Sequence, residues 1–190
     1  IGISAGSANG SSYLARQRGR NYRFYQEYAF RREYMSAHNF LHSGSYIDLD
    51  YIYSELSNHD GEYPLDYQAM MDNPAQFVVV ATDAETGNPV YFDKSVMEKD
   101  EYFPMKASSC VPLVNRPYEH EGHSYFDGGL SDPVPYEKAF AMGCDKLVVV
   151  LTRPKEVPRL PGKDRKAARV LRHEFPNIAR DLSLRSVVYN

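Results

Sequence analysis

The chain has 190 residues, of which 43% are hydrophobic and 25% charged, and its formal net charge is −3. This composition suits one globular domain with a buried core, and the scattered basic residues exclude the dense basic stripe of a nucleic-acid-binding protein. The longest apolar runs, 77–81 and 147–151, are too short to span a bilayer. Cys110 and Cys144 provide neither a disulfide framework nor metal-ligand spacing, so we expect reduced thiols in a cytoplasmic protein.

The first six residues predict a strand that turns sharply into a helix. Small residues dominate positions 4–12, which suits tight packing of this helix against a sheet, and the helix continues towards Arg18. Helical patterns follow over 21–35 and 48–56, and we interpret the polar and tyrosine-rich stretch 36–73 as short helices and loops. Because Ile1 and Gly2 already have the character of a strand end, we expect further chain to precede them.

Consecutive apolar positions over 76–82 predict a strand that is buried on both faces of a sheet. A turn at 85–89 then leads to a second strand at 90–92, which indicates a hairpin. The remaining predicted elements are a helix at 102–110, a strand at 124–127, a helix at 136–143, a buried strand at 146–152 and a helical tail at 163–189 interrupted at Pro176. This alternation predicts an α/β fold, a three-layer α/β/α sandwich with a largely parallel central sheet, in one domain spanning 1–190.

The segment Gly2-Ile3-Ser4-Ala5-Gly6 matches the G-x-S-x-G pattern of a nucleophile elbow. In this turn the serine is held between strand and helix with its hydroxyl exposed, and the flanking glycines allow close backbone approach. The helix that begins at Ala5 and Gly6 offers unpaired N–H groups and a positive dipole end to a developing oxyanion. Ser4 is therefore a candidate nucleophile, with Ala5 and Gly6 as its oxyanion support.

A serine hydroxyl needs a neighbouring base to take its proton, and histidine is the usual base. In an α/β-hydrolase the histidine follows the acid late in the chain, a place that only His173 occupies. A Ser–His–Asp esterase with His173 as base is therefore an alternative, although its surroundings are typical of a solvated helix. His120 and His123 flank Glu121-Gly122 and are better explained as residues of a hairpin turn.

A carboxylate is the stronger candidate for the base. Asp127 stands at the end of a predicted strand, where α/β sheets place their active sites, and it is followed by Gly128 and Gly129. Two glycines allow another segment to approach the carboxylate closely, so that it can accept a proton from a hydroxyl in a partly dry cleft. A D-G-G turn without chemistry remains the alternative.

Three blocks in the same order resemble the patatin-like phospholipase family. They are the elbow at 2–6, the segment Ala107-Ser108-Ser109-Cys110-Val111-Pro112-Leu113, which is similar to the family's A-S-x-x-x-P block, and Asp127-Gly128-Gly129-Leu130. The family uses a Ser–Asp dyad without histidine, and the resemblance is greatest to its bacterial members described as esterases or phospholipases. It implies a lipid-acyl hydrolase with Ser4 as nucleophile, Asp127 as base, an acyl-serine intermediate, and no metal or organic cofactor.

Two features depart from the family pattern. The glycine-rich oxyanion loop of D-G-G-G-x-R-G type, which precedes the elbow in the family, is not in this sequence. Ser131-Asp132-Pro133 stands where many members carry asparagines, although Pro135 keeps the usual proline. We therefore expect the chain to be a fragment that is inactive or poorly folded as written, whereas a complete chain is active. A non-catalytic lipid-binding member of the same fold is a further alternative.

Aromatic residues are frequent between Tyr13 and Tyr67, and their function is open. They fit either a lid that meets acyl chains or a membrane surface, or ordinary packing of helices on the sheet. Arginines of the same region fit either phosphate headgroups or a solvated helix face; they are Arg18, Arg20, Arg23, Arg31 and Arg32. The partners implied are a lipid or acyl-ester substrate and a transient membrane contact.

Overall fold

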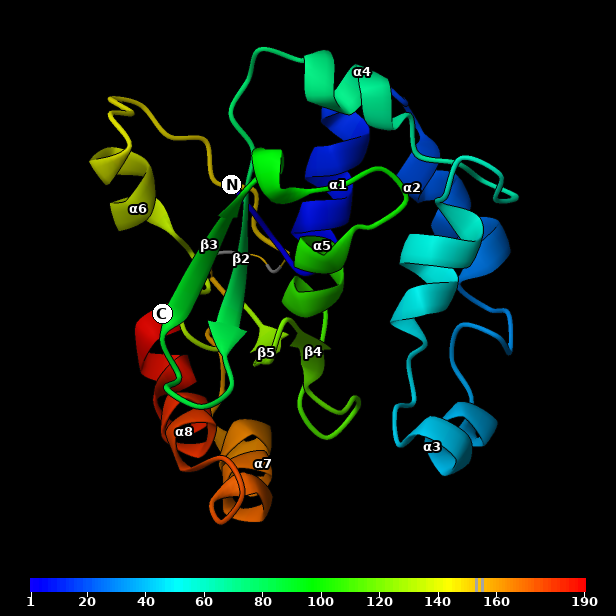
Figure 1. Cartoon of the computed structure of the whole chain (residues 1–190). Coiled ribbons are helices and arrows are strands. Elements are labelled where there is room, and N and C mark those ends of the chain that lie inside the picture. Colours follow the sequence, from blue (N-terminus) through cyan, green and yellow to red (C-terminus); the bar gives the residue numbers. More distant parts are fainter. Residues whose placement is uncertain (153, 155) are drawn as a thin grey trace.

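A computed structural model describes residues 1–152, 154 and 156–190 (Figure 1). The strands are β1 (Gly2–Ile3), β2 (Val78–Asp83), β3 (Pro89–Asp93), β4 (Tyr118–His120) and β5 (His123–Asp127). The α-helices are α1 (Ala5–Leu14), α2 (Arg20–Arg23), α3 (Ala37–Ser43), α4 (Tyr67–Asp72), α5 (Phe103–Ser108), α6 (Tyr136–Ala141), α7 (Gly162–Leu171) and α8 (Pro176–Tyr189). Two π-helical segments, Phe24–Tyr28 and Tyr51–Leu56, and a 3₁₀ turn at Lys94–Val96 complete the described elements.

The five described strands form one mixed sheet around β2. Its order is β1-β2-β5-β4, and β3 also pairs with β2. β1 runs parallel to β2, whereas the pairings β2·β3, β2·β5 and β4·β5 are antiparallel. The α/β class is confirmed, but the described pairings are mixed rather than largely parallel. The reason is that β2–β3 and β4–β5 are hairpins, whose strands must run in opposite directions.

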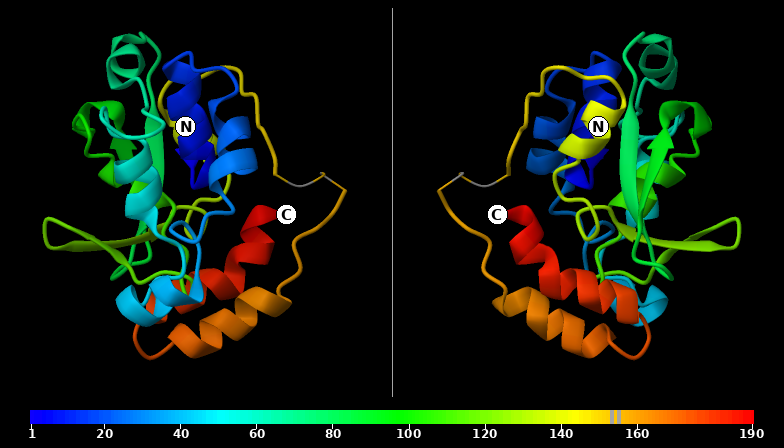
Figure 2. Two further views of the ribbon diagram at one scale, coloured as in Figure 1. Left: turned by 90° about the vertical axis from the view of Figure 1, so that its right-hand side faces the viewer. Right: turned by 90° about the vertical axis from the view of Figure 1, so that its left-hand side faces the viewer.

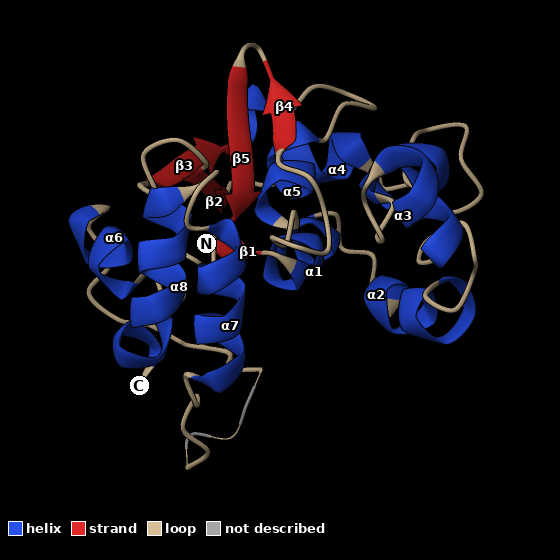
Figure 3. Cartoon of the chain, turned by 90° about the horizontal axis from the view of Figure 1, so that it is seen from below, coloured by secondary structure: helices blue, strands red, loops and turns tan. Residues whose placement is uncertain are grey.

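Helices cover both faces of the sheet. On one face Ala107 of α5 packs with Ala81 and Tyr125, and α1 contacts α5 on the same side. On the other face the ring of Phe175, just before α8, meets the ring of Phe126 at 5.2 Å. Figure 3 shows α7 and α8 on one side of the strands and α1 and α5 on the other, and Figure 2 shows α7 and α8 side by side at one end of the molecule. This arrangement is the expected three-layer sandwich.

The consecutive apolar residues of β2 are buried because helices lie on both faces. Val79, Val80 and Ala81 each have an exposed fraction of 0%, as the pattern at 76–82 predicts. The turn before β3 and the turn 121–122 between β4 and β5 also form as expected. Glu121 and Gly122 have φ of 50° and 80°, the pair of positive values that a tight hairpin turn requires.

The region between α1 and β2 forms a cap of short helical segments beside the sheet, as expected for 36–73 (Figure 1). Its own small core contains Tyr28, Tyr51 and Leu56, with Phe24 and Tyr34 packed against them. The aromatic residues that the sequence concentrates here therefore pack against one another. Several also line a cavity beside Ser4, described below.

The prediction of a buried strand at 146–152 is wrong for this structure. The segment makes no strand pairing with any described residue, and Val148 and Val150 are 94% and 90% exposed. An apolar run becomes a buried strand only when a neighbouring strand and covering helices lie against it. Within the described chain, no element lies against these valines.

Within the described residues, no helix is long and apolar enough to cross a membrane.

The aromatic contact between β5 and the start of α8 predicts a measurable energetic coupling. Phe126 is 1% exposed, so Phe126→Ala is expected to lower the free energy of unfolding by about 3–5 kcal/mol through the lost burial and the cavity left behind. Phe30→Ala is the matched control, because Phe30 is 85% exposed and its loss should change stability by less than about 0.5 kcal/mol. A double-mutant cycle with Phe175→Ala, followed by denaturant unfolding, should give a coupling of about 0.5–1.5 kcal/mol; additive losses would contradict the contact.

Candidate active site

Ser4 occupies a strained turn between β1 and α1. Its φ of 51° and ψ of −126° lie outside the regions that residues with a Cβ ordinarily adopt. Gly2 makes this turn possible, since a Cβ there would lie 2.7 Å from Ser7 Cα. Gly6 has no such requirement, because a Cβ built on it meets nothing within 4 Å. Of the two glycines of the elbow, only Gly2 is needed for close approach.

Three hydrogen bonds hold the backbone of Ser4. The Ser4 N–H donates to the hydroxyl of Ser108, a fully buried residue of α5, over 2.8 Å. The carbonyl of Ser4 accepts from the backbone N–H of Ser7 at 2.8 Å and from its hydroxyl at 2.6 Å. The N–H groups of Ala5 and Gly6 belong to the first turn of α1, where helices have no intrahelical acceptors for them. They are therefore able to serve an anion.

Asp127 lies beside Ser4 along the same edge of β2. In the register of the sheet Ile3 is opposite Val80 and Asp127 is opposite the next residue, Ala81, while β3 pairs with the other edge of β2. Because β1 runs parallel to β2, Ser4 follows Ile3 towards the position of Asp127. The structure thus brings together the two residues that the sequence singled out at opposite ends of the family match.

The carboxyl group of Asp127 is buried, with 6% of the residue exposed. Burial raises its pKa above the ordinary value, while hydrogen bonds from the Ser4 side chain and the Gly129 backbone, and the charges of Arg185 and Arg159, oppose that rise. The Gly129 N–H donates to Asp127 Oδ1 at 2.8 Å. A raised pKa makes a carboxylate a stronger base, which is what removal of a serine proton requires.

Gly128 allows the Asp127 loop to approach the backbone of β2 at close range. A Cβ on Gly128 would lie 2.1 Å from the carbonyl oxygen of Val80, so no larger residue fits without a shift of the backbone. The two residues that replace the family's asparagines provide their own support to this loop. Ser131 Oγ lies 2.8 Å from Thr82 Oγ1, and Asp132 accepts a hydrogen bond from the Tyr91 hydroxyl at 2.6 Å.

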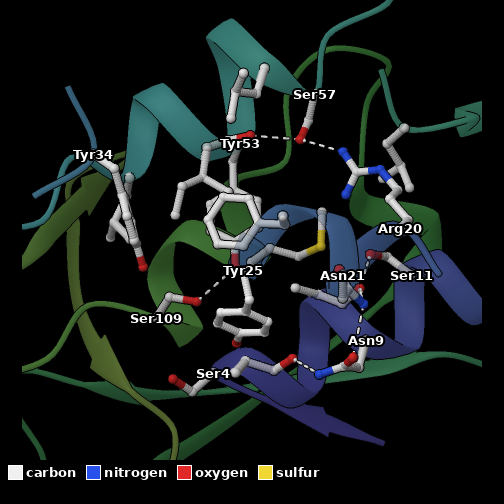
Figure 4. A pocket seen from close by; sticks show the side chains of 18 of the residues that line it. Ser4, Asn9, Ser11, Arg20, Asn21, Tyr25, Tyr34, Tyr53, Ser57 and Ser109 are labelled. Atoms are coloured by element: carbon white, nitrogen blue, oxygen red, sulfur yellow. Dashed lines mark hydrogen bonds between the residues drawn. The ribbon is translucent and has the colours of Figure 1, made fainter. Parts of the chain in front are cut away.

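A cavity of about 140 Å³ opens beside Ser4 between α1, α5 and the cap (Figure 4). For comparison, an engineered apolar cavity of about 150 Å³ is large enough to bind benzene. The apolar part of its wall comes mainly from the cap and includes Phe24, Tyr25, Tyr34, Ile52, Tyr53, Leu56 and Leu65. The structure thus places a small apolar space next to the predicted nucleophile.

The histidines lie elsewhere. His173 is exposed and accepts a hydrogen bond from Arg172, and no histidine is among the described residues that line the cavity. His120 and His123 belong to the β4–β5 hairpin, as expected, and the ring of His120 stacks on Phe103 at 3.7 Å. Among the described residues, no group of three or more His, Cys, Asp or Glu side chains could hold a metal ion.

Two residues of the site carry roles that the sequence reasoning did not assign. Ser108 supports the Ser4 backbone, and its only signal was its membership of the A-S-x-x-x-P block. For Arg20, as for the other arginines of its region, the sequence fits either phosphate headgroups or a solvated helix face, but Arg20 is only 8% exposed and lines the cavity. Nothing in its sequence neighbourhood distinguishes it from Arg23, which is exposed.

Comparison with known proteins agrees with this geometry. A model of the patatin-like phospholipase family matches residues 1–140. The match covers most of the chain, which therefore belongs to the patatin-like phospholipase family. The family is one of lipid hydrolases, and membership supports that general function.

The chain is also similar to individual bacterial proteins, whose names give no reaction. The chain is 29% identical over 166 residues to the uncharacterized protein YjjU of Escherichia coli K12, a match that covers 85% of this chain and 45% of YjjU. It is 30% identical over 77 residues to the uncharacterized NTE family proteins Mb1092c of Mycobacterium bovis and Rv1063c of Mycobacterium tuberculosis, covering 40% of this chain and 20% of each relative. The chain thus spans less than half the length of these relatives.

Gly128, beside Asp127, and Gly6, two residues after Ser4, should respond differently to an added methyl group. Gly128→Ala forces its Cβ against the Val80 carbonyl and is expected to lower the free energy of unfolding by about 1–3 kcal/mol or more. Gly6→Ala, in open space within α1, should leave stability unchanged or raise it by up to about 1 kcal/mol. Thermal and urea unfolding measure both, and equal effects of the two substitutions would overturn the steric argument.

The buried carboxylate predicts a pH-dependent gain of stability on its removal. Because the folded-state pKa of Asp127 is raised, its contribution to stability is fully present below its unfolded pKa of about 4 and is lost as the pH rises through the folded value. Asp127→Asn should therefore become more stable than wild type as the pH rises from about 4 to 7. Asp60→Asn is the control, since the Asp60 side chain is 78% exposed. If Asp127→Asn is less stable than wild type at pH 7, the interactions of the ionised carboxylate outweigh the cost of its burial, and the prediction is wrong.

Proposed function

We propose that this chain is the catalytic part of a serine lipid-acyl hydrolase, a phospholipase or esterase that uses a Ser4–Asp127 dyad. The observation that carries the proposal is the strained turn at Ser4, held beside the buried carboxylate of Asp127 by two strands of one sheet. Backbone strain of this kind persists where the surrounding structure enforces it, and it is concentrated at active sites. Membership of a phospholipase family and the apolar cavity beside Ser4 support a lipid acyl group as the substrate.

The reaction proceeds in two acyl transfers. The Asp127 carboxylate accepts the Ser4 hydroxyl proton as Oγ attacks the ester carbonyl, giving a tetrahedral oxyanion. Collapse breaks the bond to the alcohol, which leaves with the proton from Asp127, and Ser4 carries the acyl group. Water then attacks the acyl-serine while Asp127 accepts a proton from it. A second collapse breaks the bond between the acyl carbon and Ser4 Oγ, which takes the proton from Asp127, and the fatty acid is released.

The N-terminus of α1 stabilises the oxyanion in this proposal. The N–H groups of Ala5 and Gly6, in the first turn of α1, supply donors and the positive end of the helix dipole. Gly128 and Gly129 hold the Asp127 carboxylate in place, Gly128 by permitting the close approach to β2 and Gly129 by its hydrogen bond. Ser108 keeps the Ser4 turn in its strained conformation through the Ser4 N–H.

Hydrolysis of acyl esters by the full-length protein tests the dyad. Ser4→Ala and Asp127→Asn are each expected to lower kcat by about a thousandfold or more, since each removes a reacting group while the fold remains. Ser43→Ala and Asp60→Asn are matched controls at exposed positions and should retain wild-type rates. Circular dichroism of each variant establishes that it is folded.

His173→Ala separates the dyad from a histidine-based triad. An exposed histidine outside the cavity is expected to leave the rate within about twofold of wild type, because surface substitutions seldom disturb a site. If His173→Ala loses activity while Asp127→Asn retains it, the dyad is wrong. A wild type inert towards every ester would instead favour a non-catalytic lipid-binding protein.

A further inference from the structure

Arg20 is a buried cation in the cavity that Ser4 also lines. It is the first residue of α2, and only 8% of its surface is exposed. Figure 4 shows Ser4 and Arg20 on opposite sides of the cavity, with Tyr25 and Tyr53 between them. A molecule that binds in this cavity with one end at Ser4 therefore has its other end close to the guanidinium group of Arg20.

The guanidinium group is only partly satisfied by the protein. Its Nη2 donates to Ser57 Oγ at 2.9 Å and to the Tyr63 carbonyl at 2.8 Å. Its Nε is buried and has no hydrogen-bond partner among the described residues. Burial lowers the pKa of Arg20, but arginine stays protonated in proteins.

No described carboxylate pairs with Arg20, in contrast to Arg23 and Arg31 of the same region. Arg23 pairs with Glu27 at 2.8 Å, and Arg31 pairs with Glu62 at 2.6 Å, both near the surface. Arg20 instead faces an aromatic ring, since its guanidinium carbon lies 5.0 Å from the centroid of the Tyr63 ring. Burying a charge without a counter-ion costs free energy. An anion bound beside Arg20 would lower that cost.

The cavity around Arg20 has one polar and one apolar side. The polar side follows α1 and α2 and includes Asn9, Ser11 and Asn21, of which Asn21 donates to Asn9 at 2.8 Å. The apolar side is the cap wall already described. A ligand with a short apolar portion and an anionic end matches this division.

Building on the dyad proposed above, we propose that the substrate is an ester with a second, anionic group that binds Arg20. The anion is a carboxylate or a phosphate, whose paired oxygens match the two-pronged donor geometry of a guanidinium group. It comes either from the far end of the acyl chain or from the alcohol part of the ester. Arg20 then determines specificity, since an ester without the anion leaves the guanidinium buried and uncompensated.

Two pairs of substrates distinguish these sources in the full-length protein. In the first pair, 4-nitrophenyl hydrogen adipate carries a carboxylate at the end of its acyl chain and 4-nitrophenyl methyl adipate does not. In the second pair, a monoacylglycerol phosphate carries a phosphate on its alcohol part and the monoacylglycerol with the same acyl chain does not. Wild type is expected to show a kcat/KM at least about tenfold higher for the anionic member of one pair, the least that a charged hydrogen bond contributes.

Arg20→Gln should abolish this preference by lowering kcat/KM for the anionic ester while leaving that for the neutral ester within about threefold. Arg20→Lys keeps the positive charge but loses the paired donors of the guanidinium group, so it should retain part of the preference for the anionic ester. Arg23→Gln is the matched control on the same helix, because Arg23 is exposed and also lies over the Tyr63 ring, and it should retain the full preference. An Arg20 with a purely structural role would lower both members of each pair equally.

Wild type alone provides a test that does not depend on the variants folding. Hydrolysis of neutral and anionic esters at equal rates in both pairs overturns the inference about Arg20 and leaves the dyad standing. If no ester is hydrolysed, the dyad fails and calorimetric binding of octyl phosphate tests Arg20 separately. Binding at least about tenfold tighter to wild type than to Arg20→Gln supports the anion site, and equal binding or no binding overturns it.

Discussion

The backbone of Ser4, held at a φ of 51°, is the constraint around which this part of the molecule is arranged. A non-glycine residue in such a conformation costs of order 1–3 kcal/mol, and it persists only where its neighbours enforce it. Gly2 lets the chain pass close to Ser7, the Ser108 hydroxyl holds the Ser4 N–H, and α1 begins immediately after the turn. β1, α1 and α5 therefore all meet at the backbone of one serine.

The carboxylate opposite Ser4 illustrates a conflict between stability and chemistry. Burial raises the pKa of Asp127 and makes its charged form less favourable than in water, yet that same burial makes it a stronger base. The Gly129 N–H and the arginines at positions 159 and 185 oppose the effect of burial. Gly128 permits this position, because a side chain there would collide with β2. The two glycines thus serve the carboxylate in different ways.

In the proposed reaction, the cap supplies the specificity of the site, and the reactive groups lie at the ends of strands of the sheet. Its aromatic residues pack into a small core of their own, and some also form the apolar wall of the cavity. Arg20 contrasts with them, since it brings a charge into the same space through hydrogen bonds to Ser57 and Tyr63. An apolar wall and a buried cation beside the proposed nucleophile favour a substrate that has both an acyl portion and an anionic group.

The sequence alone was sufficient for several features that depend on neighbours along the chain. The elbow at 2–6, the strand of β2, the hairpin turn at Glu121-Gly122 and the glycines after Asp127 each follow from local backbone preferences or from a short motif. Membership of the patatin-like family could also be predicted, because three short blocks in a fixed order carry it.

Only the tertiary structure decided which residues meet and which are buried. The register of β1 and β5 on β2 brings Ser4 and Asp127 together, and the pairing of two hairpins makes the sheet mixed. Burial went against the local pattern twice: the apolar run at 147–151 lies against no described element, whereas the charged side chain of Arg20 lies inside the cavity. The physical reason is that burial depends on what other segments place around a residue, and its own neighbours in sequence do not contain that information.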